Sequence, residues 1–375
     1  MKDKLLHIVS FDNPFPPVYG GIVEVFYKLK PLSQLGIAIH FHCFVDEIPT
    51  QNPELEAICA KVYYYKNNKS AFDFFSRLPF SVRNRKSGNL LKNLNLIDAP
   101  ILFEGLKTTY LVSKDTLPDH HKILRLHNIE HNYFYGISKS ETNPFKKLIF
   151  FAEGLKYKYY ENVIGKFQKV ITLSNFENSI VTEKFRNAMY IPVFHGNETV
   201  QKLDGVGKYA IYHGDLRMSD NMRVAKYLIR IFKEITNFDL VIASSNGEKE
   251  IRELIQGSAN ISFSGINNFA HLKQLLNDAQ INLVFSFQQS GTKLKLMNSL
   301  CNSRFCFINE NIMDDAKVTQ LCEFTNSESE LINKISTFRN KPFQDYEIRK
   351  SVLETYMNDS ENAKILANAI FEKWN

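Results

Sequence analysis

Residues 286–300 read Ser286-Phe287-Gln288-Gln289-Ser290-Gly291-Thr292-Lys293-Leu294-Lys295-Leu296-Met297-Asn298-Ser299-Leu300. They follow an apolar run, residues 280–285, that is short enough to be a buried strand, and apolar side chains then recur at helical spacing. A strand, a small polar turn with a glycine and a helix are the layout of a phosphate site. Free backbone N–H groups and the positive end of the helix dipole face such a turn.

Two lysines lie within the first turn of this predicted helix. A cation at the N-terminal end opposes the helix dipole, so Lys293 and Lys295 are unfavourable for the helix alone. Their placement makes sense if an anion binds there. A Gly-x-Lys-x-Lys segment on a solvated helix face is the alternative, and the motif by itself leaves both interpretations open.

Length and composition indicate a globular protein of two domains. The chain has 375 residues, 44% of them hydrophobic and 23% charged, which is ordinary for a protein with sizeable cores. Its net charge of +6 is too modest to imply nucleic-acid binding. No apolar run reaches the roughly 18 residues of a transmembrane helix, and the N-terminus becomes polar too quickly for a signal peptide. Five cysteines without paired spacing suit a reducing cytoplasm and form no zinc pattern.

Basic and aromatic residues are mixed in two segments, residues 69–93 and 144–169. Such a mixture suits a peripheral protein that touches an anionic surface, here the cytoplasmic face of the inner membrane. Ordinary amphipathic helices that pack on a core have the same composition. The sequence leaves both interpretations open.

The first part of the chain predicts a parallel sheet. A strand at residues 5–10 is followed by a turn-rich loop, a helix over about residues 22–35 and a second strand at residues 37–44. This βαβ order is typical of a parallel sheet. Gly20 and Gly21, which close the loop, let the backbone approach a ligand closely. They form no Gly-x-Gly-x-x-Gly motif, so a dinucleotide fingerprint is absent.

A polar cluster follows the strand predicted at residues 122–126. It reads His127-Asn128-Ile129-Glu130-His131 and lies at the C-terminal end of that strand, where open α/β sheets bind ligands. We therefore consider His127 a candidate for chemistry, with a structural histidine bonded to backbone as the alternative. Glu130 and His131 are expected to support His127 or to start the next helix.

A second series of strands and helices begins after the glycine-containing linker 196–208. Its apolar runs of strand length lie at residues 209–214, 240–244, 261–263 and 304–308. We therefore expect an α/β protein with two Rossmann-like domains, residues 1–200 and 201–350, that face a central cleft. Residues 346–373 are predicted to be helical, and residues 351–375 to form a helix that packs back towards the N-terminal domain.

Four segments in one order cover nearly the whole chain. They are Gly20-Gly21; His127–His131 with the downstream Asn143-Pro144; Tyr212-His213-Gly214 with Asn221; and Gly291–Leu300. Together they resemble the GT-B glycosyltransferases, specifically the group-1 or family-4-like branch that builds bacterial surface polysaccharides, whose last motif is Gly-x-Lys-x-Lys-x-x-Glu-Ala-x. The resemblance implies a GT-B fold and the transfer of a hexose-type sugar from a nucleotide diphosphate sugar to a hydroxyl.

The resemblance also implies roles for single residues. Lys293 and Lys295 would bind the diphosphate and balance the charge of the leaving group, which makes a metal unnecessary. His127 would contact the transferred sugar near the reacting centre. Gly20 and Gly21 would lie against the donor phosphates or the acceptor. The remaining donor-binding residues that it implies are Gly214, Arg217, Gly291, Thr292 and Asn298.

The implied reaction retains the configuration at the anomeric carbon and needs no cofactor. The absence of an Asp-x-Asp triplet agrees with a metal-independent site. The donor is expected to be a UDP- or GDP-linked sugar, and the acceptor a growing lipid-linked glycan at the cytoplasmic membrane face. The oligomeric state is left open.

The sequence departs from the family's pattern at three positions. Asn298 stands where a carboxylate commonly grips the nucleotide ribose, and a neutral amide binds a hydroxyl less strongly. Ser290 aligns with an earlier glutamate. Asp215 replaces a basic residue, for which Arg217 is the candidate substitute. A catalytically degenerate module that binds a glycan or a partner glycosyltransferase therefore remains an alternative, and a sugar-nucleotide epimerase of the same architecture is a further one.

Overall fold

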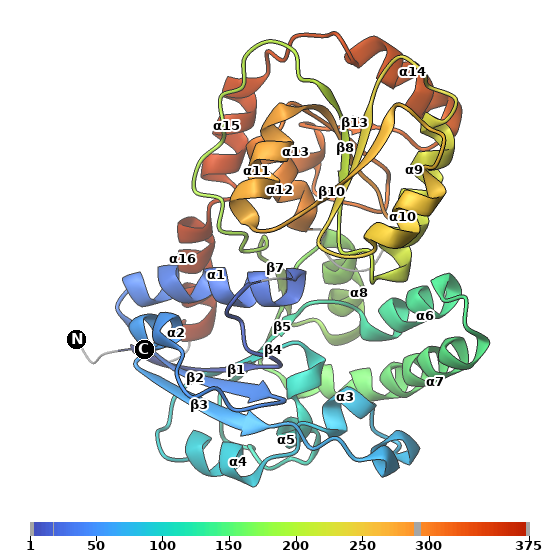
Figure 1. Cartoon of the computed structure of the whole chain (residues 1–375). Helices are drawn as coiled ribbons and strands as arrows, with labels where there is room; N and C mark the ends of the chain where they lie inside the picture. The colour runs from blue at the N-terminus through green and yellow to red at the C-terminus, as the bar shows by residue number, and fades with distance from the viewer. Residues whose placement is uncertain (1–3, 18, 289–293, 373–375) are drawn as a thin grey trace. The chain divides into compact units, whose positions relative to one another are not determined.

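The computed structural model describes residues 4–17, 19–288 and 294–372, and its chain divides into two compact units (Figure 1). Unit 1 comprises residues 1–138, 143–196 and 357–375, and unit 2 comprises residues 139–142 and 197–356. Each unit is a parallel sheet covered by helices, as the alternation of strands and helices in the sequence predicts.

Unit 1 is built on a seven-stranded sheet of order β3-β2-β1-β4-β5-β6-β7. Its strands are β1 (Lys4–Ser10), β2 (Ile37–Val45), β3 (Lys61–Lys66), β4 (Ile101–Glu104), β5 (Lys122–Leu126), β6 (Lys169–Thr172) and β7 (Ala188–Tyr190). All of them pair in parallel, so their carboxyl ends meet at one edge. The strand order reverses between β1 and β4, and open sheets of this kind bind ligands at that point.

Helices cover both faces of this sheet. The longer ones are α1 (Gly20–Gln34), α4 (Gly88–Leu94), α6 (Glu130–Ser140), α7 (Pro144–Tyr160), α8 (Asn175–Phe185) and α16 (Asp359–Phe371). Shorter helical segments are α2 (Pro53–Ile58), η1 (Ala71–Phe75), α3 (Phe80–Arg83), η2 (Leu106–Thr108), α5 (Tyr110–Ser113) and η3 (Glu161–Lys166). One buried apolar cluster lies between the sheet and the α1–α16 pair, and a second joins the sheet to the segments from α3 to α8. Central strands in such a sandwich are apolar on both faces, which explains their short apolar runs.

The C-terminal segment contains two helices. Residues 346–373 are predicted to be helical, and they form α15 (Tyr346–Thr355) in unit 2 and α16 in unit 1, with a short break between them. Asn358 starts the second helix, since its side chain accepts hydrogen bonds from the N–H groups of Ser360 and Glu361 at 2.9 and 3.1 Å. The buried side chains of α16 pack into the core beneath α1.

Unit 2 contains a six-stranded parallel sheet of order β10-β9-β8-β11-β12-β13. Its strands are β8 (Tyr209–His213), β9 (Leu240–Ser244), β10 (Ile261–Gly265), β11 (Ala279–Val284), β12 (Phe305–Ile308) and β13 (Glu323–Phe324). Its other helices are α9 (Ser219–Phe232), α10 (Glu248–Leu254), α11 (Phe269–Asp278), α12 (Leu294–Asn302), α13 (Ala316–Thr319) and α14 (Glu328–Phe338). The predicted strand and helix on either side of residues 286–293 are present as β11 and α12. Among the described residues, no helix has the length and apolar character needed to cross a membrane.

Candidate functional site

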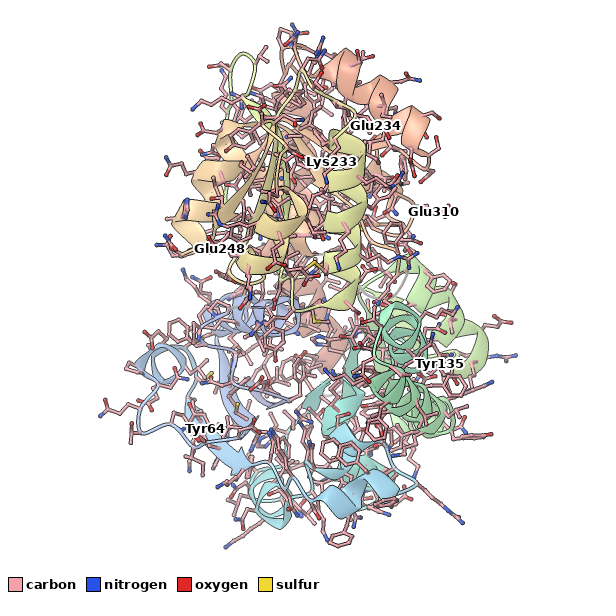
Figure 2. All side chains as sticks on the ribbon, turned by 45° about the vertical axis from the view of Figure 1, so that its right-hand side comes forward. Tyr64, Tyr135, Lys233, Glu234, Glu248 and Glu310 are labelled. Carbon is pink, nitrogen blue, oxygen red and sulfur yellow. The ribbon has the colours of Figure 1, made fainter. Side chains whose placement is uncertain are left out.

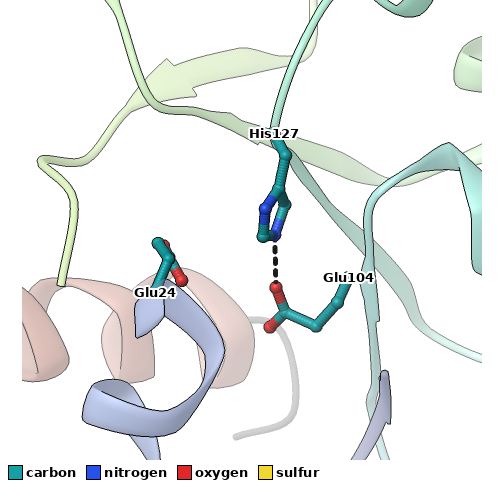
Figure 3. Close-up of side chains that lie close together, drawn as sticks. All are labelled: Glu24, Glu104 and His127. Carbon is teal, nitrogen blue, oxygen red and sulfur yellow. Dashed lines mark hydrogen bonds and ion pairs between the residues drawn. The ribbon is translucent and has the colours of Figure 1, made fainter. Parts of the chain in front are cut away.

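In unit 1, the candidate histidine lies where the sequence predicts it, directly after β5. His127 is buried, and its Nε2 lies 2.8 Å from Oε2 of Glu104, the last residue of the neighbouring strand β4 (Figure 3). The other carboxylate oxygen, Oε1 of Glu104, accepts a hydrogen bond of 2.7 Å from Nζ of Lys28 on α1. One carboxylate therefore holds a histidine and a lysine from two other elements.

A second carboxylate extends this contact into a buried ion network. Glu24, one turn before Lys28 on α1, lies 2.6 Å from Nζ of Lys28 and 2.6 Å from the guanidinium of Arg125. Arg125 also donates to the carbonyl oxygens of Ile191 and Pro192, both at 2.9 Å. Burial alone would raise the pKa of Glu24, but the positive charges of Arg125 and Lys28 outweigh it and lower the pKa to about 2. The carboxylate is thus ionised wherever the protein is folded at moderate pH.

The contact with Glu104 determines which ring nitrogen of His127 carries a proton. A carboxylate accepts hydrogen bonds and does not donate them, so the contact with Glu104 places a proton on Nε2. When the ring carries only this proton, Nδ1 holds the lone pair, and no partner for Nδ1 occurs in the described part of the chain. The edge of the ring also packs against Phe11, with ring centres 5.5 Å apart. His127 can therefore accept a hydrogen bond from a ligand hydroxyl at Nδ1.

Glu24, Glu104 and His127 also offer three possible metal-ligand atoms within 4.8 Å of one another. The ammonium of Lys28 is already 2.6 and 2.7 Å from the two carboxylates, and Arg125 occupies the remaining side of Glu24. A divalent cation would have to displace Lys28 or sit beside it against charge repulsion. The chemistry of these donors fits an ion network better than a metal centre.

The two residues predicted to support His127 have different environments. His131 is tied to η3, because its Nδ1 lies 2.7 Å from Oε2 of Glu161 and its N–H donates to Oε1 at 3.1 Å. Glu130 begins α6 and is 2% exposed, and its Oε2 is buried without a hydrogen-bond partner in the described structure. Burial raises the pKa of Glu130. His131 is therefore a structural link, and Glu130 is a polar group held at the same edge of the sheet.

The two glycines lie within α1 and not in the loop before it. α1 begins at Gly20, and none of the described side chains caps its N-terminus. A Cβ on Gly21 would lie 3.0 Å from Cζ of Phe11, the residue whose ring touches His127. The need for a small residue at Gly21 thus comes from the packing of Phe11.

In unit 2, the end of β8 carries the third sequence segment. A Cβ on Gly214 would lie 3.2 Å from the side chain of Asn221, which donates a hydrogen bond of 3.0 Å to the carbonyl oxygen of Asp215. Arg217 is 69% exposed and is paired with the carboxylate of Asp215 at 2.6 Å. The charge of Arg217 is therefore balanced by its neighbour. His213 is buried, and this burial together with Lys295 lowers its pKa to about 3, so its ring is neutral.

Lys295 lies in the first turn of α12 and faces the ends of β8 and β11. Its Nζ donates to the carbonyl oxygen of Phe285 at 2.8 Å, lies 3.5 Å from Oδ1 of Asn221 and is 5.0 Å from the centre of the Tyr212 ring. These three contacts hold the ammonium at the carboxyl ends of the two strands. A cation held at the carboxyl edge of this sheet suits a phosphate.

The start of the connection between β11 and α12 is held by a residue that sequence analysis missed. Asp220 accepts hydrogen bonds from Oγ of Ser286 at 2.7 Å and from the N–H of Phe287 at 3.1 Å. The side chains of Asn309 and Asn311 donate to the carbonyl oxygen of Ser286 at 2.7 and 3.0 Å. No sequence signal marks these residues as partners, because they come from three separate segments.

The remaining donor-site predictions divide into two groups. Asn298 lies on α12, where its Oδ1 accepts a hydrogen bond of 3.0 Å from the side chain of Asn197. Gly291, Thr292 and Lys293, together with Ser290, lie outside the described residues. Glu24, Lys28, Glu104 and Arg125 were not predicted, and the only signal for them is a charged residue within an otherwise apolar strand or helix face.

Two parallel α/β units, each with its polar site residues at the carboxyl ends of the strands, define the GT-B fold of glycosyltransferases, and the prediction of this fold is confirmed. Solved structures with this fold resemble the whole chain. Sucrose-phosphate synthase (tll1590) from Thermosynechococcus elongatus has a TM-score of 0.69 at 12% identity over 99% of both chains. HepE from Anabaena, in complex with UDP-glucose, has a TM-score of 0.57 at 12% identity over 98% of this chain and 95% of its own.

Sequence comparison gives one relative among curated proteins. An uncharacterized 44.6 kDa protein in the cps region of Klebsiella pneumoniae is 27% identical over 321 residues, which are 80% of this chain and 81% of that protein. No family model matches the chain.

Proposed function

We propose that this chain is a glycosyltransferase that moves a hexose-type sugar from a nucleotide diphosphate sugar to a hydroxyl in the synthesis of a cell-surface polysaccharide. The observation that carries the proposal is the position of the Lys295 ammonium, which contacts the carbonyl oxygen of Phe285 and the Tyr212 ring at the strand ends of unit 2 in a GT-B fold. The complex of the similar HepE with UDP-glucose supports a nucleotide-sugar donor. The relative in a cps region supports a role in polysaccharide synthesis.

The chemical step needs stabilisation of a departing diphosphate. The bond between the anomeric carbon and the phosphate oxygen breaks, and its electron pair leaves with the nucleoside diphosphate. The acceptor oxygen forms its new bond on the same face of the sugar, with retention, and its proton passes to the departing phosphate oxygen. Lys293 and Lys295 balance the developing negative charge, so no metal is required. Nδ1 of His127 accepts a hydrogen bond from a hydroxyl of the transferred sugar and orients it.

The substrates follow from the same proposal. UDP- or GDP-linked sugars are the expected donors, and a lipid-linked glycan at the cytoplasmic face of the inner membrane is the expected acceptor. Gly20 and Gly21 contribute an uncapped helix start, whose N–H groups suit donor phosphates or acceptor oxygens.

A non-catalytic module that binds a glycan or another glycosyltransferase is the second candidate. Two observations favour it: Arg217 is neutralised by Asp215, and Oδ1 of Asn298 already accepts a hydrogen bond from Asn197. Both contacts make Arg217 and Asn298 less available to bind the donor, which is the role that the resemblance assigns to them.

Nucleotide binding separates the two candidates. The melting temperature of the protein should be measured with UDP, GDP, ADP, CMP and their sugar conjugates. Saturation at a hundredfold excess over Kd adds roughly 2.7 kcal/mol to the free energy of unfolding. We expect a shift with one nucleotide that Lys295→Ala abolishes and that the control Lys226→Ala, in an exposed ion pair with Glu250, retains. No shift with any nucleotide would contradict an enzyme and support the binding module.

Turnover tests the finer parts of the proposal. Release of the nucleoside diphosphate in the presence of an acceptor should continue in EDTA, and the anomeric configuration of the product should match that of the donor. Inhibition by EDTA would overturn metal independence, and inversion would overturn the same-face attack.

A further inference from the structure

Helix α7 in unit 1 presents apolar side chains to solvent. Five of them define what we call the α7 face: Phe145 (71% exposed), Leu148 (64%), Phe151 (47%), Leu155 (40%) and Tyr159 (76%). We propose that this face binds the surface of an anionic lipid bilayer. The proposal goes beyond sugar transfer and does not depend on it, because it names a surface outside the residues that would act on substrate.

The spacing of these residues makes them one stripe along the helix. Positions 145, 148, 151, 155 and 159 follow one another at intervals of three and four residues, which is the spacing of neighbours on one side of an α-helix. A stripe of this kind normally faces a core. Here it faces outwards, so the α7 face is not explained by the fold of the unit.

The opposite side of α7 already makes the contacts that the core requires. A Cβ on Gly154 would lie 2.5 Å from the ring of Tyr135 on α6, which Figure 2 labels, so the two helices pack closely at this glycine. The ring of Tyr157 is fully buried and stacks on Phe134 of α6 with centres 5.3 Å apart. The helix is therefore packed on α6 by one side. Phe151, at the edge of the α7 face, also contacts the Tyr135 ring, with centres 5.4 Å apart, and the other four side chains of the face remain exposed.

Two further aromatic side chains lie beside this helix. Phe72 and Phe75 of η1 are 85% and 89% exposed. The ammonium of Lys156 on α7 donates a hydrogen bond of 2.8 Å to the carbonyl oxygen of Phe74, which fixes η1 against α7. The α7 face and η1 therefore belong to one surface of unit 1.

The charges around this surface indicate which kind of partner binds it. α7 carries Lys146, Lys147, Lys156 and Lys158, and its one acidic residue, Glu153, is buried and paired with Lys156 at 2.6 Å. Lysines that flank an apolar stripe extend their ammonium groups to lipid phosphates while the apolar side chains enter the interface. A second copy of the same face would place lysines against lysines. An anionic bilayer is complementary to both the apolar and the basic parts.

Vesicle binding tests this inference without any need for activity. The full chain should be sedimented with vesicles of phosphatidylcholine alone and with vesicles that also contain phosphatidylglycerol. We expect binding to the anionic vesicles, weakened roughly tenfold or more in Lys147→Glu/Lys158→Glu and in Phe145→Gln/Leu148→Gln. Phe72→Gln/Phe75→Gln should also weaken binding to the anionic vesicles.

Matched control variants change exposed lysines and apolar residues outside the α7 face. Lys233→Glu/Lys249→Glu reverses two exposed lysines of unit 2, the first of them labelled in Figure 2, and should bind like the unmodified protein. Ile48→Gln/Ile348→Gln removes two residues that are 59% and 61% exposed and should do the same. Equal binding by all variants, or no binding by the unmodified protein, would overturn the proposal. A dimer in solution that Phe145→Gln/Leu148→Gln dissociates would show instead that the face joins two copies of the chain.

Discussion

At the scale of single residues, Glu104 connects the candidate histidine to the rest of unit 1. Its two carboxylate oxygens hold His127 at 2.8 Å and Lys28 at 2.7 Å, and both of those side chains are buried. The acceptor character of the carboxylate determines which nitrogen of His127 keeps its proton. The proposed role of His127 therefore depends on its contact with Glu104.

Glu104→Gln should test this dependence. The neutral amide leaves the charge of Lys28 less compensated, so we expect the free energy of unfolding to fall by about 3 kcal/mol in urea titrations. Under conditions where the variant is folded, kcat should fall roughly tenfold or more with little change in the KM of the donor, because orientation of the sugar is lost. Asp46→Asn, which breaks an exposed pair with Lys69, should cost at most about 1 kcal/mol and leave kcat unchanged. Full turnover in Glu104→Gln would contradict a positioning role.

Glu24 predicts how the stability of the protein depends on pH. Its pKa falls from 4.5 to about 2 on folding. A lowered pKa in the folded state means that the stabilisation is fully present above pH 4.5 and is lost as the pH falls towards 2, a loss of about 3 kcal/mol. Urea titrations across this window should show stability falling with pH, and Glu24→Gln should flatten the dependence. An equal slope in the variant would show that other carboxyl groups cause it.

At the scale of elements, the contact between α6 and α7 decides which side of α7 faces solvent. Gly154 lets the ring of Tyr135 lie against the helix, and Tyr157 fills the space next to it. The sequence of α7 does not show which side of the helix faces solvent, because its apolar residues occur all around the helix. Close backbone approach at one glycine is what orients the helix.

Gly154→Ala should therefore destabilise the protein, although alanine is the better helix former. Its Cβ would lie 2.5 Å from the Tyr135 ring, so we expect a loss of about 1–3 kcal/mol in the free energy of unfolding. Gly88→Ala is the matched control, because Gly88 lies in α4 and the added Cβ would have no described atom from outside its own helical turn within 4 Å. It should be neutral or stabilising by up to about 1 kcal/mol. Tyr135→Ala in the Gly154→Ala background should recover part of the loss. Similar effects of the two glycine substitutions would contradict the packing argument.

At the scale of the whole molecule, the chain leaves unit 1 at residue 196, forms unit 2 and returns to unit 1 at residue 357. The return is held at its start by Asp359, whose carboxylate accepts hydrogen bonds from the N–H groups of His195 and Gly196 at 3.1 and 2.8 Å. α16 then buries its apolar side against the α1 cluster. Unit 1 is therefore incomplete without the last part of the chain.

Ile370→Ala should show this dependence. Ile370 is fully buried in the core of unit 1, and its truncation should lower the free energy of unfolding by about 2–5 kcal/mol. Ile365 on the same helix is 46% exposed, and Ile365→Ala should cost about 0.5 kcal/mol or less. Nucleotide affinity, measured at a temperature well below the unfolding transition, should be unchanged in both variants, because Lys295, the proposed phosphate contact, lies in unit 2. Equal destabilisation by the two substitutions would mean that α16 does not bury Ile370 in solution.

Local sequence patterns were sufficient to predict the architecture of the two units. The short apolar runs, the glycine turns and the helical spacing after residue 293 predicted β11, α12 and the parallel sheets, because backbone geometry and the burial of one face depend on neighbours in sequence. The order of four motifs predicted the GT-B fold. The position of His127 directly after a buried strand was predicted in the same way, and its role at the ligand edge of the sheet stays a prediction.

Other features depended on contacts between distant segments. Glu24, Lys28, Glu104 and Arg125 meet around His127 only because α1, β4 and β5 are adjacent in the folded unit. The outward direction of the α7 face and the break between α15 and α16 likewise depend on what packs against each helix. A periodic pattern determines that a segment has an apolar side, but only the tertiary structure decides what covers that side.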